Sequence, residues 1–160
     1  VGTGVVQCGA FIASALMIRA TLIGEEGSLM TNIGLTLLYF ALSQLGLLVY
    51  SKCHQMVTSY DIHDEIEKGN VAAGVAFGMS LIAVGVLLSG YMVKHDSILG
   101  LGVWFVMGTI LLLVARLLVD KIILPGRLLD NEIKDDKNWG AALIEGSSAI
   151  IFAFILNASF

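Results

Sequence analysis

Four polar residues lie inside long apolar stretches of this sequence, where each is costly to bury unless it is paired. They are Gln7, Gln44, Arg116 and Glu145. Glu145 lies about six residues inside one stretch and Arg116 about five residues from the end of another, which places both ~7–9 Å from the same membrane face. We expect the four to form one polar layer. That layer would be either a structural ion pair with hydrogen-bonding glutamines, the favoured interpretation, or a path for protons, ions or small solutes.

Other groups that could carry chemistry are sparse. Cys53, His54 and His63 match no zinc-binding spacing, and the side chains of an adjacent Cys-His pair cannot easily hold one ion together. The sequence contains no Gly-rich phosphate loop, no nucleophile elbow and no His-Glu-x-x-His motif. We therefore expect no enzyme activity, no cofactor and no metal ion.

The composition identifies the environment in which these residues must be positioned. The chain has 160 residues, of which 57% are hydrophobic and 14% charged, and its mean hydropathy is +0.88. Soluble domains are typically about 45–50% apolar and about 25% charged, and a domain of this size has too little interior to hide so much apolar surface. The net charge of -4 gives no basic surface for nucleic acid. The sequence therefore indicates an integral membrane protein whose first partner is the lipid bilayer.

Five apolar stretches are long enough to cross a bilayer, whose ~30 Å hydrocarbon core needs about 20 helical residues. Asn70 and Asn138 stand directly before two of them, as N-cap residues do. The sequence predicts an all-α, polytopic transmembrane helical bundle. Its predicted spans are residues 1–23, 30–50, 71–93, 98–119 and 139–158.

Most of the Lys and Arg residues between the spans lie in two loops, residues 51–70 and 120–138. Positively charged loops stay on the cytoplasmic side of a membrane. We therefore expect both loops to be cytoplasmic.

A short motif occurs in both of these loops. It consists of Glu65-Ile66 followed by Asn70, and of Glu132-Ile133 followed by Asn138. Each copy is an acidic segment with apolar residues at helical spacing, and a span that begins with small residues follows it. We expect each segment to form a short helix on the membrane surface. It would either cap the bundle or dock a cytoplasmic partner protein.

We interpret the chain as a series of two-span repeats, because the motif recurs at equivalent places. One repeat covers residues 30–93 with its Glu-Ile loop at 61–70. The next covers residues 94–160 with its Glu-Ile loop at 127–138. Residues 1–29 resemble the second half of a truncated repeat, so we expect its first half to lie upstream of residue 1.

Small residues at helical spacing mark the third and fifth predicted spans. In lipid, such residues let two helix backbones approach closely. The pattern predicts either packing of helices within one chain, which is favoured, or an oligomer interface. Its members are Gly74, Gly78, Gly85, Ala142 and Gly146.

The paired motif resembles a bacterial inner-membrane family called domain of unknown function 350. The resemblance rests on Glu65-Ile66-Glu67-Lys68-Gly69-Asn70-Val71-Ala72-Ala73-Gly74, on its second copy from Glu132 to Glu145, and on Tyr50-Ser51-Lys52. It implies a multi-pass protein of the bacterial inner membrane, linked genetically in some bacteria to envelope-stress or polyamine-related modules. It implies no enzymatic activity.

Together, these observations predict a non-enzymatic membrane scaffold or accessory subunit that works as a homo-oligomer or within a membrane complex. The motivation is the small-residue spans and the absence of a reactive cluster. The alternative is a channel or transporter with its path around Glu145 and Arg116. A dry contact between these two side chains would favour the scaffold, and a water-filled cavity between them would favour transport.

Overall fold

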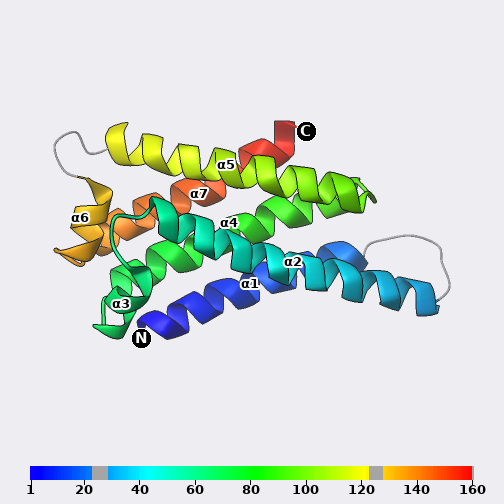
Figure 1. Cartoon of the computed structure of the whole chain (residues 1–160), viewed down its shortest axis with the longest axis horizontal. Coiled ribbons are helices and arrows are strands. Elements are labelled where there is room, and N and C mark those ends of the chain that lie inside the picture. The colour runs from blue at the N-terminus through cyan, green and yellow to red at the C-terminus, as the bar shows by residue number, and fades with distance from the viewer. Residues whose placement is uncertain (23–28, 123–127, 160) are drawn as a thin grey trace.

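The computed structural model describes residues 1–22, 29–122 and 128–159, and within these ranges the chain is helical without strands. The first residue of the predicted loop 127–138 lies outside the described residues. The helices are α1 (Gly2–Leu22), α2 (Leu29–Val57), α3 (Ile62–Glu67), α4 (Val71–Lys94), α5 (Ile98–Ile122), α6 (Leu129–Lys134) and α7 (Trp139–Ser159) (Figure 1).

Five of these helices, α1, α2, α4, α5 and α7, are long and apolar enough to cross a membrane. This confirms the predicted all-α polytopic bundle. One predicted boundary is wrong, because α2 continues to Val57 instead of ending at residue 50. The first part of the predicted loop 51–70 is therefore helical. The polar residues after Tyr50 suggested an exit from the membrane, but Tyr50 and His54 lie one turn apart and are both buried against the protein.

α4 lies at the centre of the bundle. It packs against α1 on one side and against α7 on another, and α2 and α5 cross this row of three helices (Figure 1). A helix with neighbours on several sides must be apolar around its whole circumference. The sequence of α4 meets this condition, since its residues are uncharged up to Lys94.

Glycine residues allow the backbones of α4 and α1 to approach closely. A Cβ atom added at Gly74 would lie 2.7 Å from the backbone oxygen of Gly2, and one added at Gly85 would lie 2.5 Å from the Cα atom of Ala13. Gly78 faces the backbone of α1 in the same way. These residues therefore let the backbones of α4 and α1 lie in close contact.

The small residues of α7 face α4. A Cβ atom at Gly146 would lie 2.5 Å from the Cβ atom of Met79, and Ala142 is fully buried. The whole set predicted from the spacing thus contributes to packing between α1, α4 and α7.

Both Glu-Ile segments form short helices, α3 and α6, at the same end of the bundle (Figure 1). Their apolar side chains Ile62, Leu129 and Ile133 are buried. Each segment is followed by a residue with positive φ, Gly69 at 84° and Lys137 at 50°. That conformation turns the chain directly before the capping asparagine.

Asn70 and Asn138 cap α4 and α7 in the same manner. The side-chain oxygen of Asn70 accepts a hydrogen bond from the first turn of α4 at 3.2 Å, and that of Asn138 accepts one from the first turn of α7 at 2.8 Å. The Asn70 amide donates to Glu65 Oε2 at 3.2 Å, and the Asn138 amide donates to Glu132 Oε2 at 2.9 Å. The two copies of the motif share this local geometry, while the wider two-span repeat stays a prediction.

Candidate functional site

A cluster of buried charged side chains lies near the end of the bundle that carries α3 and α6. Its centre is Arg116 on α5, which is 7% exposed. The guanidinium donates from Nε to Glu145 Oε1 on α7 at 2.8 Å and from a terminal nitrogen to Asp130 Oδ1 on α6 at 2.5 Å. A second terminal nitrogen donates to the backbone oxygen of Val57, the last residue of α2, at 3.3 Å. One side chain therefore joins α2, α5, α6 and α7.

The two carboxylates are as deeply buried as the arginine. Glu145 is 2% exposed and Asp130 is 6% exposed. The second oxygen of Asp130 accepts a hydrogen bond from the backbone nitrogen of Ser59 at 2.8 Å. Asp130 thus fixes α6 both to α5 and to the link after α2. A buried ion is tolerated only with such partners, because its desolvation costs several kcal/mol.

His54 on α2 completes the cluster. Its Nε2 atom lies 3.7 Å from Glu145 Oε1, which is too long for a hydrogen bond. The ring is buried between the aromatic rings of Tyr50 and Phe77, whose centroids lie 5.7 and 5.5 Å away. A titratable group therefore contacts the charged network in surroundings that hold little water.

The structure brings together two of the four residues predicted to form a polar layer. Arg116 and Glu145 form an ion pair in a dry contact between helices. Gln44 instead donates to Ser14 Oγ on α1 at 3.0 Å. Gln7 is exposed on α1, a helix that packs on α2, α3 and α4. The single layer expected from depth alone is therefore replaced by a cluster of different members.

Sequence reasoning missed Asp130 and His54 as members of this cluster. Asp130 looked like one of many solvated acids, although its spacing from Ile133 puts both on one face of a helix. His54 looked like a loop residue because α2 was expected to end earlier. Continuing the helix would have placed it on the same face as Leu47 and Tyr50, which are both buried.

A second polar group lies around Asn70, which is fully buried. The Asn70 amide donates to the backbone oxygens of Ile133 at 2.8 Å and Lys134 at 3.3 Å, on α6. Its neighbour Glu65 also accepts a hydrogen bond from Lys68 Nζ at 2.9 Å. Hydrogen bonds from Lys68 and Asn70 hold the pKa of the Glu65 carboxyl below its usual range. Glu65 is therefore ionised at neutral pH and anchors α3 to the start of α4.

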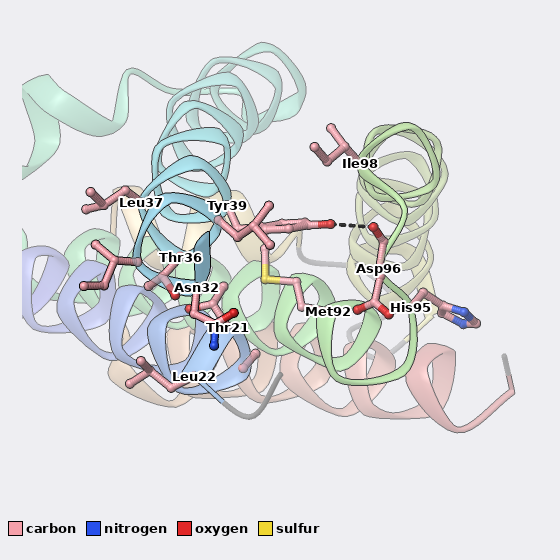
Figure 2. A pocket seen from close by; sticks show the side chains of 13 residues that line it. Thr21, Leu22, Asn32, Thr36, Leu37, Tyr39, Met92, His95, Asp96 and Ile98 are labelled. Carbon is pink, nitrogen blue, oxygen red and sulfur yellow. Dashed lines mark hydrogen bonds between the residues drawn. The ribbon is translucent and has the colours of Figure 1, made fainter. Parts of the chain in front are cut away.

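A cavity of about 490 Å³ opens at the other end of the bundle, between the ends of α1 and α4 and the starts of α2 and α5 (Figure 2). The hydroxyl of Tyr39 crosses it to donate to the backbone oxygen of Asp96 at 2.7 Å. The wall also includes the apolar side chains of Leu22, Leu37 and Met92. The cavity shares no lining residue with the charged cluster.

The comparison of the chain with protein families decides its classification. A family model described as Domain of Unknown Function (DUF350) matches residues 28–160. The chain belongs to the DUF350 family. The matched range contains every member of the charged cluster and both capping asparagines, so the DUF350 region of this chain holds the whole candidate site.

A curated relative supports the membrane assignment. The UPF0719 transmembrane protein YshE of Bacillus subtilis (strain 168) is 26% identical to this DUF350 chain over 120 residues, which cover 75% of this chain and 88% of YshE. No solved structure matches the chain. This DUF350 protein is therefore a multi-pass membrane protein of an uncharacterised family.

Proposed function

We propose that this DUF350 protein is a non-enzymatic membrane module, a scaffold or accessory subunit, and that α3 and α6 form its binding surface for a partner protein. The observation that carries the proposal is the fixation of both short helices on the bundle. The Asn70 amide, at the start of α4, donates to two backbone oxygens on α6. The same amide also donates a hydrogen bond to Glu65 on α3.

The two helices therefore present a surface of fixed shape. Their inner sides are buried and mostly apolar, with Glu65 and Asp130 bonded there, while Asp64, Glu67 and Asp135 on the outer side are exposed. A preorganised surface loses less conformational entropy when it binds a folded partner than a flexible loop does. This supports a docking role for the ordered end of the bundle.

The ion pair of Arg116 and Glu145 also supports a scaffold. It lies in a dry contact that joins helices, and Arg116 ties the end of α2 to α6. Such a network holds the docking surface in one position relative to the membrane spans. The proposal includes the predictions that this end is cytoplasmic, that the membrane is the bacterial inner membrane and that the role concerns envelope stress.

The test is the composition of the complex that the full chain forms. The protein is extracted in a mild detergent from its own cells, and native mass spectrometry measures the mass of the assembly. We expect a homo-oligomer or a stoichiometric partner. A strictly monomeric protein without a companion contradicts the proposal.

A matched pair of variants tests the binding surface. Charge reversal of Asp64 and Glu67 to Lys changes the exposed side of α3, and reversal of Asp96 changes an exposed acid at the far end. We expect the first variant to lose the partner and the second to keep it. Equal behaviour of the two variants would argue against docking on α3 and α6.

Transport is the second candidate, and one observation favours it. Glu145 Oε2 and His54 Nε2 are buried without a hydrogen-bond partner in the described structure. A polar path along the bundle would use such atoms as temporary binding positions. Transport predicts that Glu145→Gln changes ion or proton flux in liposomes while the fold survives. Unchanged flux in this variant, or no flux in the wild-type protein, excludes it.

A further inference from the structure

The charged cluster contains more acid than base. Arg116 contributes one positive charge, while Asp130 and Glu145 contribute two negative charges when ionised. With a neutral His54 ring, the sum is one net negative charge. All of these side chains are buried, and a net charge in such surroundings is strongly disfavoured. The cluster therefore lacks one positive charge.

The hydrogen bonds of Thr58 determine which nitrogen of His54 carries its proton. The Thr58 hydroxyl donates its only hydrogen to the backbone oxygen of His54 at 2.8 Å. The same hydroxyl lies 3.4 Å from His54 Nδ1, where it can act only as an acceptor. Nδ1 therefore carries the hydrogen of the neutral ring, and Nε2 presents a bare lone pair.

That lone pair faces a carboxylate. His54 Nε2 lies 3.7 Å from Glu145 Oε1, so two acceptors meet without a donor between them. Nε2 and the other carboxylate oxygen of Glu145 are buried with no hydrogen-bond partner among the residues of the described structure. The contact between His54 and Glu145 therefore lacks a hydrogen-bond donor, and it lies in the cluster that lacks one positive charge.

We propose that His54 and Glu145 form a proton-binding site in which one exchangeable proton is held between the imidazole Nε2 and the carboxylate. The proton neutralises the cluster and gives the pair the donor that it lacks. Either partner can carry it, as an imidazolium beside a carboxylate or as a carboxylic acid beside a neutral ring. This inference goes beyond the scaffold role and does not depend on it.

The groups around this site leave His54 and Glu145 as the two that exchange the proton. Arg116 is the fixed cation and stays protonated throughout the accessible pH range. Burial raises the pKa of the Tyr60 phenol, and the charges of Glu145 and Asp130 act in the same direction, so this phenol stays neutral. On α4, the side chain that contacts His54 is the apolar ring of Phe77. The titratable and charged groups that face the pair are Tyr50 on α2, Tyr60 after α2, Arg116 and Asp120 on α5, and Asp130 on α6.

The test follows both partners through a pH titration of the full chain in lipid bilayers. Nuclear magnetic resonance of histidine-labelled protein reports the imidazoles, and infrared spectroscopy reports protonated carboxyl groups. The variant His54→Gln identifies the His54 signal. Glu145→Gln removes the partner while leaving Arg116 paired with Asp130. His63→Gln is the control, because this exposed histidine pairs with Glu67 on α3, outside the cluster.

We expect the midpoint of the His54 titration to move by more than about one pH unit in Glu145→Gln, as it does for strongly coupled groups. In His63→Gln the midpoint should stay where it is. The carboxyl band that changes in the same pH range should titrate at a different pH in His54→Gln, which gives a second readout if Glu145→Gln does not fold. Two results overturn the proposal: a His54 signal that titrates alike with and without Glu145, or a folded protein in which neither the His54 signal nor a carboxyl band that depends on His54 titrates.

Discussion

Replacement of Arg116 by Gln tests whether the buried cluster is an ionised network. The substitution removes the one fixed cation and leaves Asp130 and Glu145 near each other. Counted without the proton proposed between His54 and Glu145, the net charge of the cluster falls from one negative to two. The substitution also removes the donors to Glu145, Asp130 and the end of α2. Removal of one partner from a buried ion pair typically costs about 3–5 kcal/mol. We expect a loss of free energy of unfolding in this range.

Glu145→Gln provides the informative contrast. The glutamine keeps the shape of the side chain and an oxygen that can accept from Arg116, and the remaining Arg116–Asp130 pair is neutral. The exchange of a charge-assisted hydrogen bond for a neutral one costs about 1 kcal/mol. Relief of the excess negative charge offsets part of that cost. We therefore expect Glu145→Gln to be at least about 2 kcal/mol more stable than Arg116→Gln.

The assay is reversible unfolding in mixed micelles, with the denaturing detergent titrated and helix content followed by circular dichroism. Arg19→Gln is the control, because Arg19 is exposed near the end of α1 and should change stability by less than about 0.5 kcal/mol. If Arg116→Gln and Glu145→Gln lower stability equally, the cluster does not carry an excess negative charge and the reasoning fails.

Three further predictions use the same assay. Gly9→Ala places a methyl group against the backbone of α4 and should cost about 1–3 kcal/mol, whereas Gly4→Ala meets open space and should be neutral or stabilising; equal effects would contradict the glycine contact. Asn70→Ala removes a helix cap and leaves the backbone oxygens of Ile133 and Lys134 without this donor, so it should lower the free energy of unfolding by about 2–3 kcal/mol. Asn138→Ala, at the exposed cap, should lower it by about 1 kcal/mol. The reverse order would contradict the bonds from Asn70 to α6. The pKa of Glu65 is lowered in the folded protein, so the carboxylate stabilises the fold above its unfolded pKa of about 4.3, and this stabilisation is lost as the pH falls through the lower folded value. Glu65→Gln should therefore weaken the loss of stability on acidification from about pH 6 to pH 3. An unchanged pH profile would contradict the anchoring role.

Much of the fold follows from local properties of the sequence. The length of an apolar stretch decides whether it can span a bilayer, so the spans are determined before any packing is known. The asparagines before α4 and α7 are local signals as well, because an N-cap bonds to its own first turn. The apolar spacing of the two Glu-Ile segments likewise determines that α3 and α6 are short helices with one buried side.

Only the tertiary structure shows which residues form the charged cluster. Depth along a helix can be counted from the sequence, and this count placed Arg116 and Glu145 at the same level. The direction in which a side chain points around the helix axis depends on which neighbour packs there. For that reason Gln44 bonds to Ser14 instead of Arg116, and α6 brings Asp130 into the cluster. The sequence determined which residues cross the membrane and where the helices begin, whereas only packing decided which polar groups meet, because a buried polar group bonds to whatever partner the neighbouring helix offers.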